Sequence, residues 1–397
     1  MGLRQLVDKI KPNFEKGGKL HAFRSVFGGF ETFLFVPNHT AKSGSNIHDC
    51  FDSKRMMIMV CIALVPALLF GMYNVGYQNY AAAGMLEAAT FMQVFGYGFL
   101  AVLPKIIVSY LVGLGIEFTV AQWKGEEIHE GFLVSGLIIP MIVPVGTPLW
   151  IIALATAFAV IFAKEIYGGT GMNIFNVALV TRAFIFFAYP SAISGDSVWI
   201  GESSIWGLGF DKTAFVDGWS GATALGDAAT ATTGLAYPKF TMDMVWGFIP
   251  GSIGETSVVA IGLGALILLG TGVASWKTML SVFVGGGLMA WVFNQCGSAD
   301  NAVAMMPWYQ HLALGGFCFG AVFMATDPVT SCRTECGKYI YGFLIGVVAI
   351  LIRVLNPGYP EGMMLAILLM NLFAPLIDYY VYQSNVSKRA KRAANSK

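Results

Sequence analysis

The sequence predicts an all-α polytopic membrane protein with ten transmembrane helices. Of its 397 residues, 56% are hydrophobic and 12% are charged, whereas about 25% are charged in an average soluble domain. Several long stretches contain no Asp, Glu, Lys or Arg, and one spanning helix needs about 20 apolar residues. These stretches are continuous and do not alternate with a period of two, which excludes a transmembrane β-barrel. They cover residues 56–86, 131–163, 256–276, 278–299 and 301–326.

The ten predicted spans are centred near residues 65, 108, 137, 156, 182, 264, 286, 318, 346 and 371. Prolines in PMIVPVGTP separate the third span from the fourth, between Ile139 and Leu149. The first 55 residues contain nine Lys or Arg and no short apolar core, so we expect no cleaved signal peptide. Residues 388–397 contain five more cations, and positive loops stay in the cytoplasm. Both ends are therefore predicted to be cytoplasmic, whereas loop 190–255, with seven acids and two lysines, is external.

These assignments divide the chain into five predicted parts, of which two are related repeats. GFLVSG resembles GFCFG, AVIFAKEIYGG resembles VAILIRVLNPG, and FFAYP resembles LFAPLID, at offsets of 184 to 189 residues. Matching spans are five apart, so the halves have opposite topology, an arrangement typical of transporters with broken helices near the midplane. Chance similarity between small-residue helices is the alternative. The parts are a cytoplasmic N-terminal extension (1–54), a first five-helix membrane repeat (55–190), an external loop (191–256), a second five-helix repeat (257–382) and a basic cytoplasmic tail (383–397).

Three acids lie within predicted spans, where a charge costs about 2.5–3.5 kcal/mol on insertion scales. Asp378 lies in the last span, Asp327 at the proline break of the eighth, and Glu117 near the end of the second. Carboxylates and carbonyls freed beside prolines are oxygen ligands that suit Na⁺. The alternative is that these acids lie at helix ends in water.

Other polar groups in the spans leave two interpretations open. Arg182, inside the fifth span, either snorkels or pairs with an acid. Asn173 and Asn176 open that span, and their amides suit either a flat hydrogen-bonding ring such as isoalloxazine or a helix cap.

Cys332 and Cys336 cannot alone complete a tetrahedral metal site. A net charge of +1 gives no sign of nucleic-acid binding.

The external loop reads DGWSGATALG, and several other blocks accompany it: YGGTGMNIFN, MATDPV, LIRVLNPGYPEGMMLAIL and NLFAPLID. With these blocks and the N-terminal FETFLFVPNHT, the chain resembles the B subunits of the Na⁺-translocating NADH:quinone oxidoreductases over essentially its whole length. The D subunit of the Rnf electron-transfer complexes shares the core but has a shorter N-terminus. The resemblance implies a component of a Na⁺-pumping enzyme in the bacterial inner membrane. An Rnf-type subunit and a flavin-free solute channel or transporter are the alternatives.

The resemblance implies that Thr223 carries FMN through a phosphoester to its hydroxyl. The attachment motif is met by Asp217, Ser220, Gly221 and Ala222. A threonine hydroxyl is a weak nucleophile and no base lies nearby in the sequence, so a separate flavin transferase is expected. Gly221 and Ala222 leave the segment unobstructed for that enzyme. The alternative is an unmodified flexible loop.

The resemblance also implies a non-covalent riboflavin, contacted by Asn173 and Asn176. Met172 and Val177 stand where arginine and proline are common in the family. A quinone, either ubiquinone or menaquinone, is expected at the N-terminal extension and at Gly113, Leu114 and Phe132; the position of Leu114 is usually glycine.

Further site residues and partners also follow from the resemblance. Asp378, Asp327 and Glu117 align with acids of the Na⁺ path, and Phe319 and Phe323 with an aromatic constriction. The implied partners are a second covalent-FMN subunit and iron–sulfur subunits. NADH and clusters are expected on those subunits, because this chain has no nucleotide fingerprint and no cluster-type cysteine run.

Overall fold

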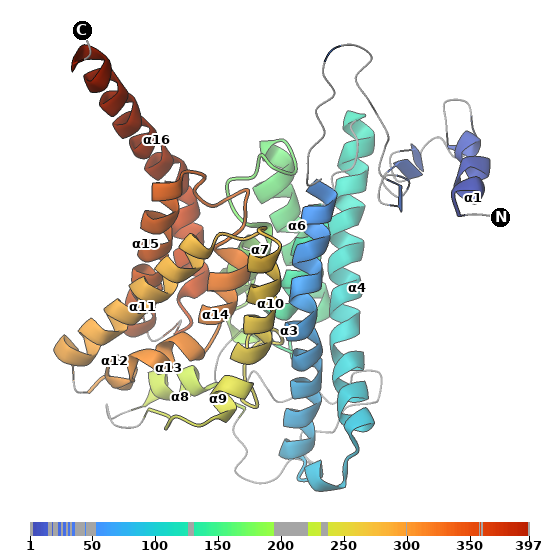
Figure 1. The fold of residues 1–397 in the computed structure, drawn as a ribbon. Coiled ribbons are helices and arrows are strands. Elements are labelled where there is room, and N and C mark those ends of the chain that lie inside the picture. The colour runs from blue at the N-terminus through green and yellow to red at the C-terminus, as the bar shows by residue number, and fades with distance from the viewer. Residues whose placement is uncertain are drawn as a thin grey trace.

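In the computed structural model every regular element among the described residues is a helix (Figure 1). This confirms the all-α prediction. The described residues are 3–14, 18, 23–24, 27–28, 31, 34–35, 44, 53–125, 131–193, 221–231, 237–298, 300–356, 358 and 360–395.

Among these residues, six helices are long and apolar enough to cross a membrane, which supports the prediction of a polytopic membrane protein. The third of them runs from α6 through a π-helical turn (Val160–Lys164) and a 3-10 turn (Glu165–Tyr167). The six are built on α3 (Ser53–Ala82), α4 (Phe91–Lys124), α6 (Leu149–Ala159), α11 (Trp276–Cys296), α15 (Glu335–Leu355) and α16 (Met363–Asn395).

The other four predicted spans are shorter helices. They are α5 (Phe132–Met141), α7 (Val177–Ala188), α10 (Val258–Gly270), and a broken segment of α13 (Trp308–Ala313), α14 (Phe317–Phe319) and a π-helical turn (Gly320–Met324). At 1.5 Å per residue, the first three are about 15–20 Å long, less than a hydrocarbon core of about 30 Å. A helix therefore occurs at every predicted centre, but ten complete spans stay a prediction.

Irregular stretches lie at both of the proline breaks predicted from the sequence. One separates α5, which ends at Met141, from α6, which begins at Leu149, as the prolines predict. The other covers residues 325–334, between the π-helical turn and α15. Each break follows a short helix and precedes a long one, so the order of elements agrees with the predicted repeat. The inverted relation of the halves stays a prediction.

Glycines let the helices approach closely, as small residues do in membrane proteins. A Cβ atom on Gly98 of α4 would lie 1.7 Å from the Met72 carbonyl oxygen of α3. A Cβ atom on Gly346 of α15 would lie 2.2 Å from the Val282 carbonyl oxygen of α11. No side chain fits at either position, so these two contacts require glycine.

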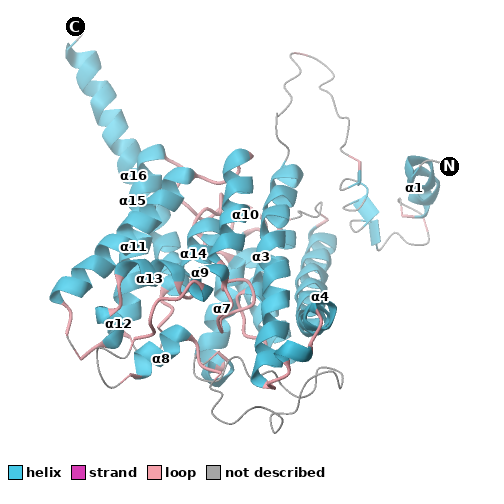
Figure 2. Cartoon of the chain, turned by 60° about the horizontal axis from the view of Figure 1, so that its bottom comes forward, coloured by secondary structure: helices cyan, strands magenta, loops and turns pink. Residues whose placement is uncertain are grey.

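Three short helices outside the predicted spans lie at the end of the bundle opposite the chain termini (Figures 1 and 2). At this end are α8 (Ala224–Thr230), α9 (Asp243–Trp246) and α12 (Ala302–Met305). At the other end lie α1 (Leu3–Ile10), the start of α3 and the end of α16. The predicted tail is the last part of α16, so residue 383 is no helix boundary. Within the described ranges, 3-10 turns lie at Lys11–Asn13, Leu86–Ala88, Glu165–Tyr167 and Pro190–Ala192.

Candidate functional site

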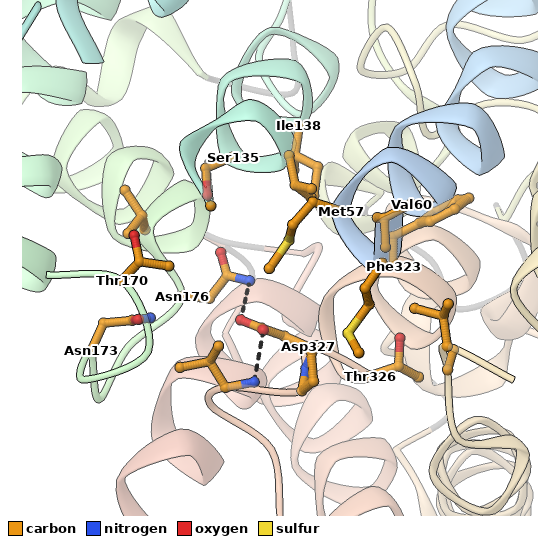
Figure 3. Close-up of a pocket in the computed structure, with 18 of the residues that line it drawn as sticks. Met57, Val60, Ser135, Ile138, Thr170, Asn173, Asn176, Phe323, Thr326 and Asp327 are labelled. Atoms are coloured by element: carbon orange, nitrogen blue, oxygen red, sulfur yellow. Dashed lines mark hydrogen bonds between the residues drawn. The ribbon is translucent and has the colours of Figure 1, made fainter. Parts of the chain in front are cut away.

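A cavity of about 80 Å³ lies where the start of α7 meets the second break (Figure 3). Four of the site residues predicted from the sequence line it: Asn173, Asn176, Phe323 and Asp327. The two asparagines come from the first predicted repeat and the other two residues from the second. The fold therefore brings together groups that are about 150 residues apart in the chain.

Asn176 links the start of α7 to the second break through both ends of its amide. Its Oδ1 accepts from the backbone N–H groups of Ala178 at 3.0 Å and Leu179 at 3.4 Å, so it caps α7. Its Nδ2 donates to Oδ2 of Asp327 at 3.2 Å. The cap predicted from the sequence is confirmed, and it coexists with a contact to the predicted Na⁺ path.

Asp327 accepts three hydrogen bonds from neighbouring groups. Besides Asn176, Thr330 donates its hydroxyl to Oδ2 at 3.0 Å, and Val329 donates its N–H to Oδ1 at 3.1 Å. Ser135, Thr170 and Thr326 line the cavity together with the asparagines and Asp327, so hydroxyl, amide and carboxylate oxygens lie around it. This donor set fits a small hydrated cation.

The cavity is small for a flavin, because ligand pockets are usually about 300–1,000 Å³. The hydrogen-bonding groups of Asn173 and Asn176 fit an isoalloxazine edge, whereas the volume does not fit its rings. The loop between α6 and α7 has glycines with φ of 115°, 92° and 90° at positions 168, 169 and 171. A cavity that holds riboflavin would have to be larger than this one.

Glu117 is linked to the cavity through Lys164. The two side chains form a buried ion pair, in which Lys164 Nζ donates to Glu117 Oε1, and Lys164 also lines the cavity. The second carboxylate oxygen of Glu117 has no hydrogen-bond partner within the described part of the chain. This oxygen is therefore free to act as a ligand.

Asp378 does not line this cavity. Its Oδ2 accepts from the N–H of Arg333 at 2.8 Å, and its Oδ1 accepts from the N–H and hydroxyl of Thr334 at 3.0 and 2.6 Å. Thr334 is the N-cap of α15. In this conformation Asp378 fixes the start of α15, and a bound cation would have to replace some of these donors.

Phe319 and Phe323 form a tilted pair, with ring centroids 5.0 Å apart. Both are buried. Phe323 forms part of the cavity wall, and a Cβ atom on Gly264 of α10 would lie 2.5 Å from its Cζ. The aromatic pair therefore fills the space between the cavity and α10.

The residues predicted for quinone binding lie together at the contact of α4 with α5. A Cβ atom on Gly113 would lie 1.9 Å from Cζ of Phe132, whose side chain is fully buried, and Leu114 is partly buried beside them. The ring of Tyr110 meets Phe132 edge to face, with centroids 6.4 Å apart. The Phe132 ring thus occupies the space that glycine leaves at this position.

Replacing Gly113 with alanine is expected to displace the Phe132 ring and lower stability by about 1–3 kcal/mol, the usual cost of overpacking. Gly115→Ala is the matched control, because a Cβ atom at Gly115 meets nothing within 4 Å. Thermal unfolding in detergent compares the two variants. Equal midpoints for both would contradict the contact.

Thr223 lies at the other end of the bundle, as the N-cap of α8. Its Oγ1 accepts from the N–H of Gly226 at 3.1 Å, and its side chain is half-buried. Gly221 and Ala222 precede it without regular structure, whereas Asp217 and Ser220 lie outside the described residues. The cap uses the oxygen as an acceptor, and no described residue receives its hydrogen. The hydroxyl is therefore chemically suited to esterification.

A buried polar cluster around Arg182 and Arg353 was not predicted as a cluster from the sequence. Arg182 is buried and pairs with Glu255 at 3.3 Å and with Glu361, which confirms that it pairs with an acid. It also donates to the Ile142 carbonyl in the first break. Arg353 is fully buried and donates to the Glu361 carbonyl at 3.1 Å. The only sequence signal for this cluster was an arginine within each of two apolar runs.

A model of the NQR2, RnfD, RnfE family matches residues 40–387. The chain belongs to this family. This confirms the resemblance found in the sequence.

Three relatives, each named as the B subunit of a Na(+)-translocating NADH-quinone reductase, are similar to almost the whole chain. The protein from Chromohalobacter salexigens is 44% identical, and the match covers 99% of this chain and 97% of the relative. Those from Pseudomonas aeruginosa and Klebsiella pneumoniae are 41% and 42% identical, covering 99% of this chain and all of each relative. The similarity therefore includes the N-terminal extension.

Proposed function

We propose that the chain is the membrane electron-transfer subunit of a Na⁺-translocating NADH:quinone oxidoreductase in a bacterial inner membrane. The observation that carries this proposal is the similarity, at 41–44% identity over nearly full length, to chains with that name. Helices α8, α9 and α12 lie at one end of the bundle and the chain termini at the other (Figure 1). This arrangement is consistent with cytoplasmic termini and an external loop that carries the flavin.

Thr223 is the proposed attachment point of FMN. Its position at the start of α8 and its unengaged hydrogen support an ester with the FMN phosphate. Asn173 and Asn176 would hold riboflavin by hydrogen bonds once the cavity enlarges. When bound, these flavins supply the electron transfer, and the chain supplies their positions.

The proposed Na⁺ path includes Asp327, Glu117 and Asp378. The oxygens around Asp327 and the second oxygen of Glu117 support this assignment. Phe319 and Phe323 would limit passage from the cavity. Transport further requires that the charge of the flavins changes the relative stability of two conformations.

The remaining assignments complete this proposal. Gly113, Leu114 and Phe132 would contribute to a quinone site together with the N-terminal extension. The chain would be divided into the five parts predicted from the sequence, and its two membrane repeats would have opposite topology. The chain would work with a second covalent-FMN subunit and iron–sulfur subunits, after maturation by a flavin transferase.

Asp327→Asn and Asp378→Asn are each expected to raise the Na⁺ concentration for half-maximal turnover about tenfold, which corresponds to ~1.4 kcal/mol. An amide keeps one acceptor oxygen but loses the charge that attracts a cation. Asp243→Asn is the control, because Asp243 is exposed at the start of α9. Na⁺ titration of quinone reduction by the purified complex is the measurement. An unchanged titration would remove that acid from the path.

The function itself is tested by asking whether the purified complex reduces quinone with NADH in a Na⁺-stimulated reaction. The proposal predicts that it does, and that this chain fluoresces as a flavin band on a denaturing gel. Reduction of ferredoxin with no quinone activity would indicate an Rnf-type subunit. A chain without flavin would indicate a channel or transporter.

A further inference from the structure

A groove of about 370 Å³ runs between α15 and α16 at the end of the bundle that carries the chain termini. Its apolar part includes Ile340 and Val381, and its polar part includes Ser384, Asn385 and Lys388. Ile340 is 46% exposed, so the apolar part opens to the surroundings of the bundle. The groove, which we call the α15–α16 groove, is separate from the cavity at Asp327 and shares no lining residue with it.

The length of α16 places this groove at a membrane surface. Its 33 residues span about 50 Å, well beyond a hydrocarbon core of about 30 Å. Tyr379, Tyr380 and Tyr382 are 56%, 65% and 64% exposed, as aromatic residues are at membrane–water interfaces. Tyr380 and Val381 line the groove at the level of this belt, Ile377 lines it about one turn closer to the membrane core, and Lys388 lies beyond the belt.

The charge of α16 around the polar part of the groove is positive. Residues 379–395 of α16 contain Lys388, Arg389, Lys391 and Arg392 and no acid. Two acids lie near the start of α15, and both are already bound. Glu335 pairs with Lys277 and with Lys338, the latter at 2.7 Å, and Asp378 accepts from the backbone of residues 333 and 334.

We propose that the α15–α16 groove binds an anionic phospholipid. The phosphate would receive hydrogen bonds from Lys388, Ser384 and Asn385, and an acyl chain would lie along Val381, Ile377 and Ile340. The juxtaposition of a basic, hydrogen-bonding end and an apolar end across the aromatic belt matches the chemistry of such a lipid. A zwitterionic lipid lacks the net negative charge, and a free phosphate lacks the acyl chain.

Cys336 provides a readout without mutation, because it lines the groove and is exposed. Cys296, also exposed, lies at the far end of α11 and is the internal control. The delipidated complex in detergent is alkylated with a small maleimide, and each cysteine peptide is quantified by mass spectrometry. Dioleoyl phosphatidylglycerol is expected to slow alkylation of Cys336 several-fold, whereas dioleoyl phosphatidylcholine and inorganic phosphate leave it unchanged. The rate at Cys296 should not respond.

Two variants separate a built site from general attraction to a basic helix. Lys388→Gln is expected to abolish the protection, whereas Lys391→Gln, which removes the same charge outside the groove, should keep it. Equal protection by phosphatidylcholine, or equal loss in both variants, would overturn the proposal. So would a Cys336 that is unreactive in the complex before lipid is added, because another subunit would then cover the groove.

Discussion

Thr223→Val is expected to remove covalent flavin from the chain and to abolish Na⁺-dependent quinone reduction, while the chain still inserts and assembles. Valine has nearly the shape of threonine but no hydroxyl to esterify. The lost N-cap of α8 costs about 1 kcal/mol, which is small beside the packing of the bundle. The measurement is flavin fluorescence of the chain on a denaturing gel, together with turnover of the complex.

Thr230→Val is the matched control for this variant. Thr230 lies on the same helix, and its hydroxyl donates to the Gly226 carbonyl at 3.0 Å, so its loss perturbs α8 without touching the proposed attachment point. The control should keep both flavin and turnover. A Thr223→Val chain that still fluoresces would contradict the assignment.

Arg182→Met is expected to lower the stability of the chain by about 3–5 kcal/mol, the cost of breaking a buried ion pair from one side. The change leaves Glu255, which is almost fully buried, without its partner cation. It also removes the ion pair with Glu361 and the hydrogen bond to the Ile142 carbonyl. The segments that contain Ile142, Glu255 and Glu361 therefore all lose a contact with α7. The thermal midpoint in detergent and the yield of inserted protein report the effect.

The double variant Arg182→Met with Glu255→Met distinguishes charge from packing. If the cost of the single variant comes from an uncompensated buried carboxylate, the double variant should be more stable than Arg182→Met alone. Lys277→Gln supplies the comparison with an exposed pair, because its partner Glu335 is 62% exposed and such pairs contribute about 0–1 kcal/mol. A double variant that is less stable than Arg182→Met would contradict the ionic account.

Much of the fold could be predicted because the bilayer imposes local rules on the sequence. Uncharged runs located the helices, and the prolines between Met141 and Leu149 located a break. The amide of Asn176 was recognised as a possible cap because a cap depends only on the residues next to it. Lengths were less predictable: α16 continues through the basic tail, since Lys and Arg are good helix formers.

The partners of the charged residues could not be predicted in the same way. Lys164 and Glu117 are 47 residues apart, and Arg182 and Glu361 are 179 apart. The residues next to one member of such a pair do not identify the other member, because the two side chains are brought together only when the helices pack. The sequence left open whether Arg182 snorkels or pairs with an acid, and only the packed structure identifies Glu255 and Glu361 as its partners.

The central claim is that Thr223 carries FMN, and intact-peptide mass spectrometry of the native chain tests it most directly. Trypsin releases residues 213–239, which contain Thr223, Ser220 and Thr230. We predict that this peptide carries the mass of FMN less one water, and that fragmentation places the addition on Thr223. An unmodified peptide from an active complex, or an addition on another residue, would contradict the account.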